Sequence, residues 1–257
     1  MTDVSRFIVP DWQVPAHVNA LSTTRKGGIS QGAFSSNNLA LHVNDMPSVV
    51  EKNRALLRKN AGLTVEPVWL TQTHSATVVD IGDEQGGAMA GEKAAEPVRA
   101  DASFSSKPGK VCVVMTADCL PLLLCDKKGT QVAAIHAGWR GLLNGIIENT
   151  VNMFSVPGAD IIAWFGPAIG PKAFEVGREV KELFVNQDID ALKAFRQCSE
   201  DKWLANIYAL AAMRLKNLGV AEISGGQYCT FRDGSRFYSY RRDQVCGRMA
   251  TLVWLDK

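Results

Sequence analysis

Long apolar runs separated by polar turns dominate the middle of the chain. Residues 111–115, 120–125, 131–135 and 159–165 are almost continuously apolar, and turn-forming residues separate them. Runs of this length without polar alternation are typical of strands buried on both faces. They predict buried strands that meet at a common edge of a sheet, and His136 stands at the end of the third run.

Helical periodicity lies on either side of these runs. Residues 48–60 repeat apolar positions at helical spacing and then reach a glycine, which predicts a helix. Further helices are predicted near 138–153, 177–186 and 202–217. Residues 82–99 are rich in Gly, Ala and Glu without an apolar period, which predicts a surface loop.

The sequence pattern at the two ends of the chain predicts mainly strands and loops. Residues 18–43 mix short apolar runs with turn signals, and residues 237–243 and 247–255 look like two strands around a turn. Strands and helices are interspersed without a regular βαβ alternation. We therefore predict an α+β fold, with mixed β-sheets flanked by helices in a single layered domain over residues 1–257.

Composition and charge exclude several partners. The 257 residues are 46% hydrophobic, which suffices for a large core, and 28 Lys and Arg nearly balance 26 Asp and Glu. This balance predicts no binding to nucleic acid or to an anionic membrane. No apolar run approaches the roughly 20 residues of a membrane span, and the first residues do not resemble a signal peptide. We expect a cytoplasmic protein, either a monomer or a weak homo-oligomer.

The candidate chemistry involves few residues. The chain has four histidines, and its six cysteines are scattered without a CxxC pair, as is typical of a reducing compartment. His74 lies in a polar segment, Cys119 follows Asp118 inside an apolar stretch, and His136 ends a strand. Two imidazoles and one thiolate leave one open position on a catalytic zinc, which would lower the pKa of a bound water toward about 7.

The residues by themselves leave other interpretations of this triad open. Two His and one Cys are also the equatorial ligands of a copper site. Cys119 could instead be a thiolate nucleophile with His136 as its base. A structural zinc is disfavoured because such sites normally have four protein ligands.

Several longer motifs point to a known family. The chain resembles the YfiH-like family, which is also called laccase domain, polyphenol oxidase, purine nucleoside phosphorylase and peptidoglycan editing factor. The resemblance runs from about Leu21 to the C-terminus. It rests on blocks that keep the family order: TADCLP from Thr116, HAGWRG from His136, GPAIGP from Gly166 followed by Phe174-Glu175, and SYRRD from Ser239 followed by Gly247-Arg248.

The resemblance implies both a metal and a reaction. It implies a zinc ion bound by His74, Cys119 and His136. It also implies phosphorolysis of adenosine, inosine, guanosine and methylthioadenosine, together with deamination of adenosine, so the expected ligands are purine nucleosides and phosphate. Ser75 departs from the glycine found in many relatives, and we expect a local change in the loop there without loss of the metal.

Phosphorolysis requires an anion site beside the nucleoside. Arginine suits this role because its planar guanidinium makes paired hydrogen bonds to oxyanions. Arg25, Arg241 and Arg242 lie in polar, motif-like segments, and Arg140 follows His136 near a predicted helix start. We take these four as candidate phosphate ligands. Asn38, in another family-like block, is a candidate for contact with the ribose or the base.

The remaining site predictions concern catalysis. We predict catalytic roles for Cys119 and His136, with Asp118 as a general base or as a residue that orients a ligand. Two other functions stay open: a copper-dependent polyphenol oxidase, and a Cys-His hydrolase that edits a peptidoglycan precursor. Four histidines are too few for the several copper centres of a multicopper oxidase.

Overall fold

The computed structural model describes residues 6–82 and 98–256. Most of the loop predicted at 82–99 therefore lies outside the described residues. No helix in the described part of the chain is long and apolar enough to cross a membrane.

A six-stranded mixed sheet forms the centre of the fold. Its strand order is β12-β8-β6-β7-β4-β3; β6 is antiparallel to both β7 and β8, and each edge pair, β3–β4 and β8–β12, is parallel. The strands are β3 (Val78–Asp80), β4 (Ala102–Ser105), β6 (Leu120–Asp126), β7 (Val132–Ala137), β8 (Ile161–Phe165) and β12 (Glu222–Gly225).

A second, four-stranded antiparallel sheet packs against the first. It has the order β1-β2-β13-β5 and joins the two ends of the chain, because β13 pairs with both β2 and β5. Its strands are β1 (Phe7–Ile8), β2 (Val18–Thr23), β5 (Val111–Thr116) and β13 (Met249–Leu255).

The packing of β5 explains why its sequence shows no polar alternation. Cys112 and Val114 belong to the core between the two sheets, where they join Leu123 and Trp164 of the larger sheet. The intervening residue Val113 belongs to a different core on the outer face of the small sheet. Both faces of the strand are therefore buried, as the apolar run predicted.

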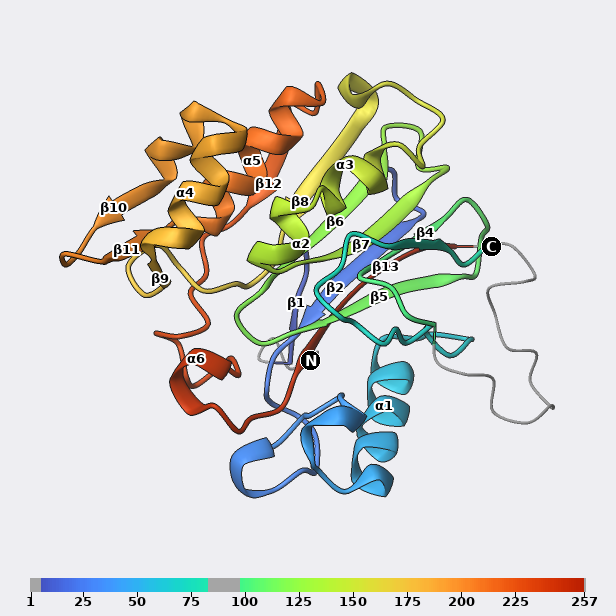
Figure 1. Ribbon diagram of the computed structural model, residues 1–257. Helices are drawn as coiled ribbons and strands as arrows, with labels where there is room; N and C mark the ends of the chain where they lie inside the picture. The colour runs from blue at the N-terminus through green and yellow to red at the C-terminus, as the bar shows by residue number, and fades with distance from the viewer. Residues whose placement is uncertain (1–5, 83–97, 257) are drawn as a thin grey trace.

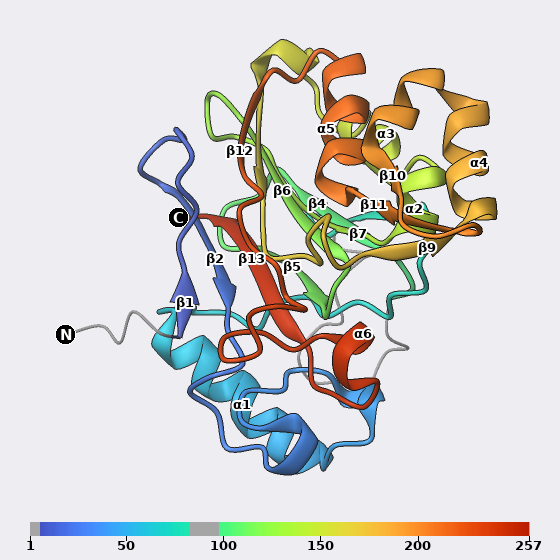
Figure 2. The same cartoon turned by 90° about the vertical axis from the view of Figure 1, so that its left-hand side faces the viewer.

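Helices cover the outer face of each sheet. α1 (Pro47–Asn60) lies against the four-stranded sheet through Leu57, which packs with Leu21 and Leu252. This helix confirms the prediction at 48–60. The fold thus has four layers in the order helix, sheet, sheet, helices, as the two views in Figures 1 and 2 show.

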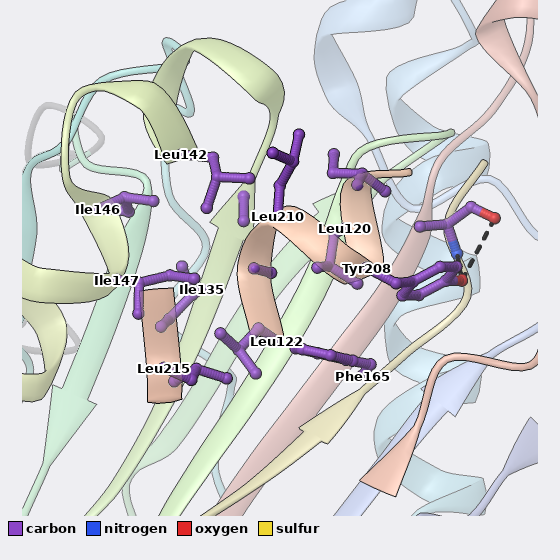
Figure 3. Close-up of a cluster of buried hydrophobic side chains, with 14 of the residues drawn as sticks. Leu120, Leu122, Ile135, Leu142, Ile146, Ile147, Phe165, Tyr208, Leu210 and Leu215 are labelled. Atoms are coloured by element: carbon purple, nitrogen blue, oxygen red, sulfur yellow. Dashed lines mark hydrogen bonds between the residues drawn. The ribbon is translucent and has the colours of Figure 1, made fainter. Parts of the chain in front are cut away.

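The helices on the far side bury the largest apolar cluster. They are α2 (Trp139–Leu143), α3 (Ile146–Val151), α4 (Arg178–Gln187) and α5 (Ile207–Asn217). Figure 3 shows Leu122 and Ile135 of the sheet facing Ile147 of α3 and Leu210 and Leu215 of α5. The predicted α+β class, with mixed sheets flanked by helices, is confirmed, and α4 confirms the helix predicted at 177–186. The extent of the domain stays a prediction.

A small third sheet corrects one of the predicted helices. It has the order β10-β11-β9 and consists of β9 (Glu175–Gly177), β10 (Phe195–Gln197) and β11 (Lys202–Ala205). The helix predicted at 202–217 is confirmed over Ile207–Asn217 as α5, but its start is wrong, because residues 202–205 form β11. The side chain of Asn206 accepts a hydrogen bond from Ala209 N, and this cap starts α5 at Ile207.

Two other predicted elements differ from the structure. The helix predicted at 138–153 is broken at Gly145, whose φ of 91° is left-handed and ends the helical path between α2 and α3. The strand predicted at 237–243 is wrong. Phe237 is buried in irregular backbone, and the residues after it form the short helix α6 (Tyr240–Asp243), which Ser239 caps by accepting a hydrogen bond from Arg242 N.

Candidate metal centre and its cavity

Three side chains from different segments meet at the edge of the sheets. His74 lies in the loop before β3, Cys119 in the connection from β5 to β6, and His136 near the end of β7. Their ligand atoms all lie within 4.8 Å of one another, and Cys119 Sγ is 3.7 Å from His74 Nε2. The two imidazole rings meet edge to face, with their centroids 4.8 Å apart. The structure therefore brings together the triad predicted from the sequence.

The two loops that carry His74 and Cys119 have unusual backbone conformations. His74 has a φ of 61°, and Asp118, directly before Cys119, has a φ of 89°. Residues other than glycine rarely adopt this left-handed region, and each such position costs on the order of 1–3 kcal/mol. Such positions persist only where neighbouring contacts hold them, and both loops have these contacts.

Asp101 holds the His74 loop and His136 together. Its fully buried carboxylate accepts hydrogen bonds from the backbone N–H groups of Thr73 (3.1 Å), His74 (3.0 Å) and Ser75 (2.7 Å). The Ser75 hydroxyl donates to the same carboxylate at 2.7 Å. His136 Nδ1 lies 2.8 Å from Asp101 Oδ1, so Nδ1 carries the proton and Nε2 is left for the cluster.

The protonation states in the cluster are strongly perturbed. Burial acts to raise the pKa of the Cys119 thiol, but the charge of His136 and hydrogen bonds with His136 and His74 outweigh it and lower this pKa to about 6. Burial acts to lower the pKa of His136, but Cys119 and Asp101 raise it to about 9. Despite burial, the hydrogen bonds from His136 and Ser75 hold the pKa of Asp101 below its usual value. Cys119 is thus disposed to be a thiolate, the form that binds metals.

Two glycines of the HAGWRG block allow the loops to approach each other closely. A Cβ atom on Gly138 would lie 2.8 Å from His74 Cδ2 and 3.1 Å from Cys119 Sγ. A Cβ atom on Gly141 would lie 2.8 Å from the carbonyl oxygen of Ser75. A larger residue at Gly138 would therefore push two ligands apart, and one at Gly141 would displace the backbone directly after His74. The donor set, its thiolate and this close packing fit a bound metal ion.

The cluster opens into a cavity of about 560 Å³. Such a volume is typical of sites for small organic ligands. The lining combines the triad with apolar, aromatic and cationic side chains: His42, Gln72, His74, Met115, Thr116, Ala117, Asp118, Cys119, His136, Trp139, Arg140, Ile169, Phe174, Ile207, Tyr240, Arg241 and Arg248.

Asp118 lines the cavity, but other groups already occupy its carboxylate. Oδ1 accepts from the Thr230 hydroxyl at 2.6 Å, and Oδ2 accepts from the Ser239 hydroxyl at 2.9 Å and from Arg241 N at 2.7 Å. These bonds tie the Cys119 loop to the C-terminal segment that forms one wall. Of the two roles predicted for Asp118, positioning agrees better with this geometry than that of a general base.

Arg140 and Arg241, predicted as phosphate ligands, both line the cavity, and Arg248 joins them. None of the three forms an ion pair with a carboxylate within residues 6–82 and 98–256. Each guanidinium lies over an aromatic ring that also lines the cavity, at 4.3–5.8 Å from its centroid. The pairs are Arg140 with Trp139, Arg241 with Phe174, and Arg248 with Tyr240. Arg241 also donates to the carbonyl oxygen of Glu175, and Arg248 donates to those of Cys246 and Gly247, contacts that leave their charge uncancelled. The positive charge of these three lining residues therefore remains available to an anion.

The other three predicted ligand residues do not line the cavity. Arg25 donates to the carbonyl oxygens of Ser35 and Gly234. Arg242 donates to three carbonyls of the C-terminal segment and to the carboxylate of Asp243. Asn38 is fully buried and bonds to the backbone of Ala40 and Arg248 and to Asp45. Their groups hold the polypeptide in place, and binding roles for them stay predictions.

Two residues that matter in this geometry are not predictable as site residues from the sequence pattern. Asp101 precedes a buried strand, and a carboxylate in that position suggests a specific partner, but nothing in the sequence identifies His136, 35 residues later, as that partner. Arg248 was recognised only as part of a motif. Its place at the end of a long C-terminal segment gave no indication that it reaches the cavity.

The fold and the cluster together define a layered α+β protein with a His-Cys-His centre suited to a metal ion. Residues 19–256 match the model of the family described as multi-copper polyphenol oxidoreductase laccase, and the chain belongs to this family. Two of its relatives are named purine nucleoside phosphorylase YfiH. The one from Shigella flexneri and the one from Escherichia coli are each 50% identical over 252 residues, which is 98% of this chain and 100% of theirs.

Solved structures agree with this assignment. A crystal structure of a Neisseria meningitidis protein is similar with a TM-score of 0.91 and 45% identity, covering 98% of this chain and 100% of that one. YlmD from Geobacillus stearothermophilus matches with a TM-score of 0.85 and 27% identity over 94% of this chain and 93% of that one. The resemblance to the YfiH-like family that the sequence blocks indicated is confirmed.

Proposed function

We propose that this chain is a zinc-dependent purine nucleoside phosphorylase. Phosphorolysis of adenosine, inosine, guanosine and methylthioadenosine would take place in the cavity above His74, Cys119 and His136. The observation that carries the proposal is that one cavity is lined both by this three-donor cluster and by three arginines that form no ion pair with a carboxylate of the described residues. Relatives at 50% identity that are named purine nucleoside phosphorylase support the same substrate class.

Two imidazole nitrogens and one thiolate with an open fourth position are a typical ligand set for catalytic zinc. His74, Cys119 and His136 would hold the ion, and the bound ion would supply a Lewis acid that polarises an oxygen of the ligand. The lowered pKa of Cys119 supports metal binding near neutral pH, because most of the thiol is then already deprotonated.

The rest of the cavity would bind and orient the two substrates. Arg140, Arg241 and Arg248 would bind phosphate through charge-assisted hydrogen bonds. The rings of Trp139, Phe174 and Tyr240 supply flat apolar surface for a purine. Phosphate held beside C1′ attacks that carbon, the glycosidic bond breaks and its electron pair leaves with the base, which takes up the proton of hydrogen phosphate. The products are a free purine and ribose 1-phosphate, or methylthioribose 1-phosphate from methylthioadenosine.

Adenosine deamination is a second proposed activity of the same cavity. It requires attack by water at the carbon bearing the exocyclic amine, and a zinc site with His and Cys ligands can support that reaction. The geometry that favours it is the open side of the cluster, since His74 is exposed and Cys119 is half-buried. This reaction uses no phosphate, so the two activities separate when phosphate is omitted.

One assay set tests both activities. The metal content of the purified protein is measured by mass spectrometry, and inosine and adenosine are then incubated with and without phosphate and analysed by chromatography. We expect zinc, hypoxanthine from inosine only with phosphate, and inosine from adenosine without phosphate. If zinc-loaded protein forms neither free base nor inosine, the proposal is wrong.

Two alternatives give different results in the same assays. A copper-dependent polyphenol oxidase would contain copper and oxidise phenols, although a multicopper centre needs more histidines than this chain has. A Cys-His hydrolase would need no metal and would leave Cys119 open to alkylation in the metal-loaded protein. Cytoplasmic location and a monomeric or weakly oligomeric state stay predictions.

A further inference from the structure

The carboxylate of Asp101 contacts two of the three ligand segments at once. His136 Nδ1 and His74 N share its Oδ1, and Thr73 N, Ser75 N and the Ser75 hydroxyl share its Oδ2. The three backbone N–H groups can only donate, the Ser75 hydroxyl donates in this arrangement, and Nδ1 must donate if Nε2 is to bind a metal. The site therefore requires a group that accepts hydrogen bonds on both of its oxygens.

The backbone of Asp101 strengthens the link to His136. Asp101 O accepts a hydrogen bond from His136 N at 2.7 Å, so the two residues are joined through both main chain and side chain. Asp101 N donates to Thr77 O at 2.9 Å, which closes the His74 loop from its far end. The carboxylate thus lies at the point where the ends of two strands and the ligand loop meet.

We propose that Asp101 is the positioning residue of the metal centre: it sets the tautomer of His136 and holds the left-handed backbone of His74 so that both imidazoles face Cys119 before a metal binds. Asp101 itself does not touch the metal. The Ser75 hydroxyl contributes by donating an additional hydrogen bond to the carboxylate. The inference rests on the metal centre of the proposed function, but not on which nucleoside reacts there.

A neutral isostere cannot replace this carboxylate. In Asp101→Asn one oxygen becomes an NH₂ group. If that group takes the place of Oδ2, it faces the N–H groups of Thr73 and Ser75, and if it takes the place of Oδ1, it faces the N–H of His74 and Nδ1 of His136. Either orientation sets donor against donor and loosens one histidine. We expect a 10- to 100-fold weaker zinc affinity, the range found when an outer-shell partner of a metal ligand is lost.

The chain offers a matched control in Asp126. This carboxylate is also fully buried and holds a loop by accepting hydrogen bonds from Thr130 N and Gln131 N, each at 2.6 Å, and from the Thr130 hydroxyl at 3.0 Å. It touches none of the metal ligands. Asp126→Asn should lower the melting temperature as Asp101→Asn does, while its zinc affinity stays within about twofold of wild type.

The test measures zinc Kd by competition with a chromophoric chelator for wild type, Asp101→Asn, Asp126→Asn and Ser75→Ala. Melting temperatures and the absorption spectra of the Co²⁺-loaded proteins are recorded in parallel. We expect Asp101→Asn to lose affinity and to change the cobalt ligand-field bands. Ser75→Ala keeps all the backbone donors, so we expect a loss of about 3- to 10-fold.

The possible outcomes separate the hypotheses. Wild type that binds no zinc overturns the proposed metal centre as a whole. Wild-type affinity in Asp101→Asn, or an equal loss in Asp126→Asn, overturns the role of Asp101 and leaves the metal centre standing. If Asp101→Asn does not fold, the zinc Kd of Ser75→Ala decides: a weaker Kd supports the role, and an unchanged Kd overturns it.

Discussion

The two sides of the cavity are built in different ways. On the metal side, His136 and the His74 loop are held by hydrogen bonds of 2.7–3.1 Å to one buried carboxylate, that of Asp101. Elsewhere on the lining, Arg140, Arg241 and Arg248 lie over aromatic rings and make no ion pair within the described residues.

This difference matches what each side is proposed to bind. A metal ion requires ligands fixed to within a few tenths of an ångström, and a carboxylate network supplies that precision. A phosphate requires positive charge that no protein anion has already neutralised, and stacking on rings holds a guanidinium without cancelling its charge. Substitutions on the two sides should therefore change different measurements.

Removal of a ligand should have the largest effect. Cys119→Ser and His136→Ala each delete one of three donors, and we expect loss of stoichiometric zinc and a fall in inosine phosphorolysis of about 10³-fold or more. A metal ion supplies several kcal/mol of transition-state stabilisation, and 1.36 kcal/mol corresponds to tenfold in rate. Metal analysis and kcat/KM for inosine check both parts.

Cys198→Ser is the matched control for that experiment, because Cys198 is exposed and is not among the residues that line the cavity. It should keep full zinc content and full activity. If His136→Ala retained wild-type phosphorolysis, the metal side would have no part in the reaction, and the comparison between the two sides would fail.

Crowding of the ligands should have the next largest effect. Gly138→Ala places a methyl group 2.8 Å from His74 and 3.1 Å from Cys119, so one of the ligands must move. The backbone of Gly138 has a φ of −68°, which alanine adopts freely, so the expected effect comes from the contact alone. We predict a zinc Kd weaker by about 10- to 100-fold, as for other disturbances of metal ligand geometry. An alanine variant with wild-type zinc affinity would show that the ligands tolerate displacement.

The same contrast explains what the sequence could predict. Residues 111–115 and 120–125 were predicted as buried strands because burial on both faces leaves a continuous apolar run, and the structure has strands at Val111–Thr116 and Leu120–Asp126. The triad was predictable because His and Cys are scarce and stand in recognisable motifs. Asp101 was not, since its partners lie 26 to 35 residues away and only the fold joins them.

The errors have local causes that pattern alone could not resolve. Apolar spacing over residues 202–217 suggested one helix, but Asn206 is a capping residue and divides a strand from a helix. The alternating pattern of residues 237–243 suggested a strand, but Ser239 caps a helix there and its hydroxyl also donates to Asp118. In both places a polar capping residue within an apolar pattern marked the boundary.

Substitutions on the arginine side should change phosphate binding without changing metal binding. We expect Arg248→Ala to raise KM for phosphate about 10- to 100-fold, because a hydrogen bond between charged groups contributes about 1.5–3 kcal/mol. Zinc content should stay at wild-type level and KM for inosine should change little. Initial rates over a matrix of phosphate and inosine concentrations give both constants.

Arg178→Ala is the control for charge alone, because Arg178 is exposed and does not line the cavity. Its KM for phosphate should equal that of wild type. Loss of zinc from Arg248→Ala would show that phosphate binding and metal binding are coupled and not separate.

The smallest expected effect concerns the thiol of Cys119 in metal-free protein. Its pKa is lowered to about 6, and an acid is deprotonated above its pKa, so the thiolate fraction falls as pH drops through 6. The rate of alkylation by iodoacetamide should therefore rise about tenfold from pH 5 to pH 7 and then level off, since the thiolate is the reactive form. Cys112 and Cys125, whose pKa values burial raises to about 12, should stay unmodified over this range.

Peptide mass spectrometry follows each cysteine separately, and added zinc should protect Cys119. A rate that keeps rising through pH 8 to 9 would mean that His136 and His74 do not stabilise the thiolate before metal binds, so the metal side would be organised by the ion and not by the protein.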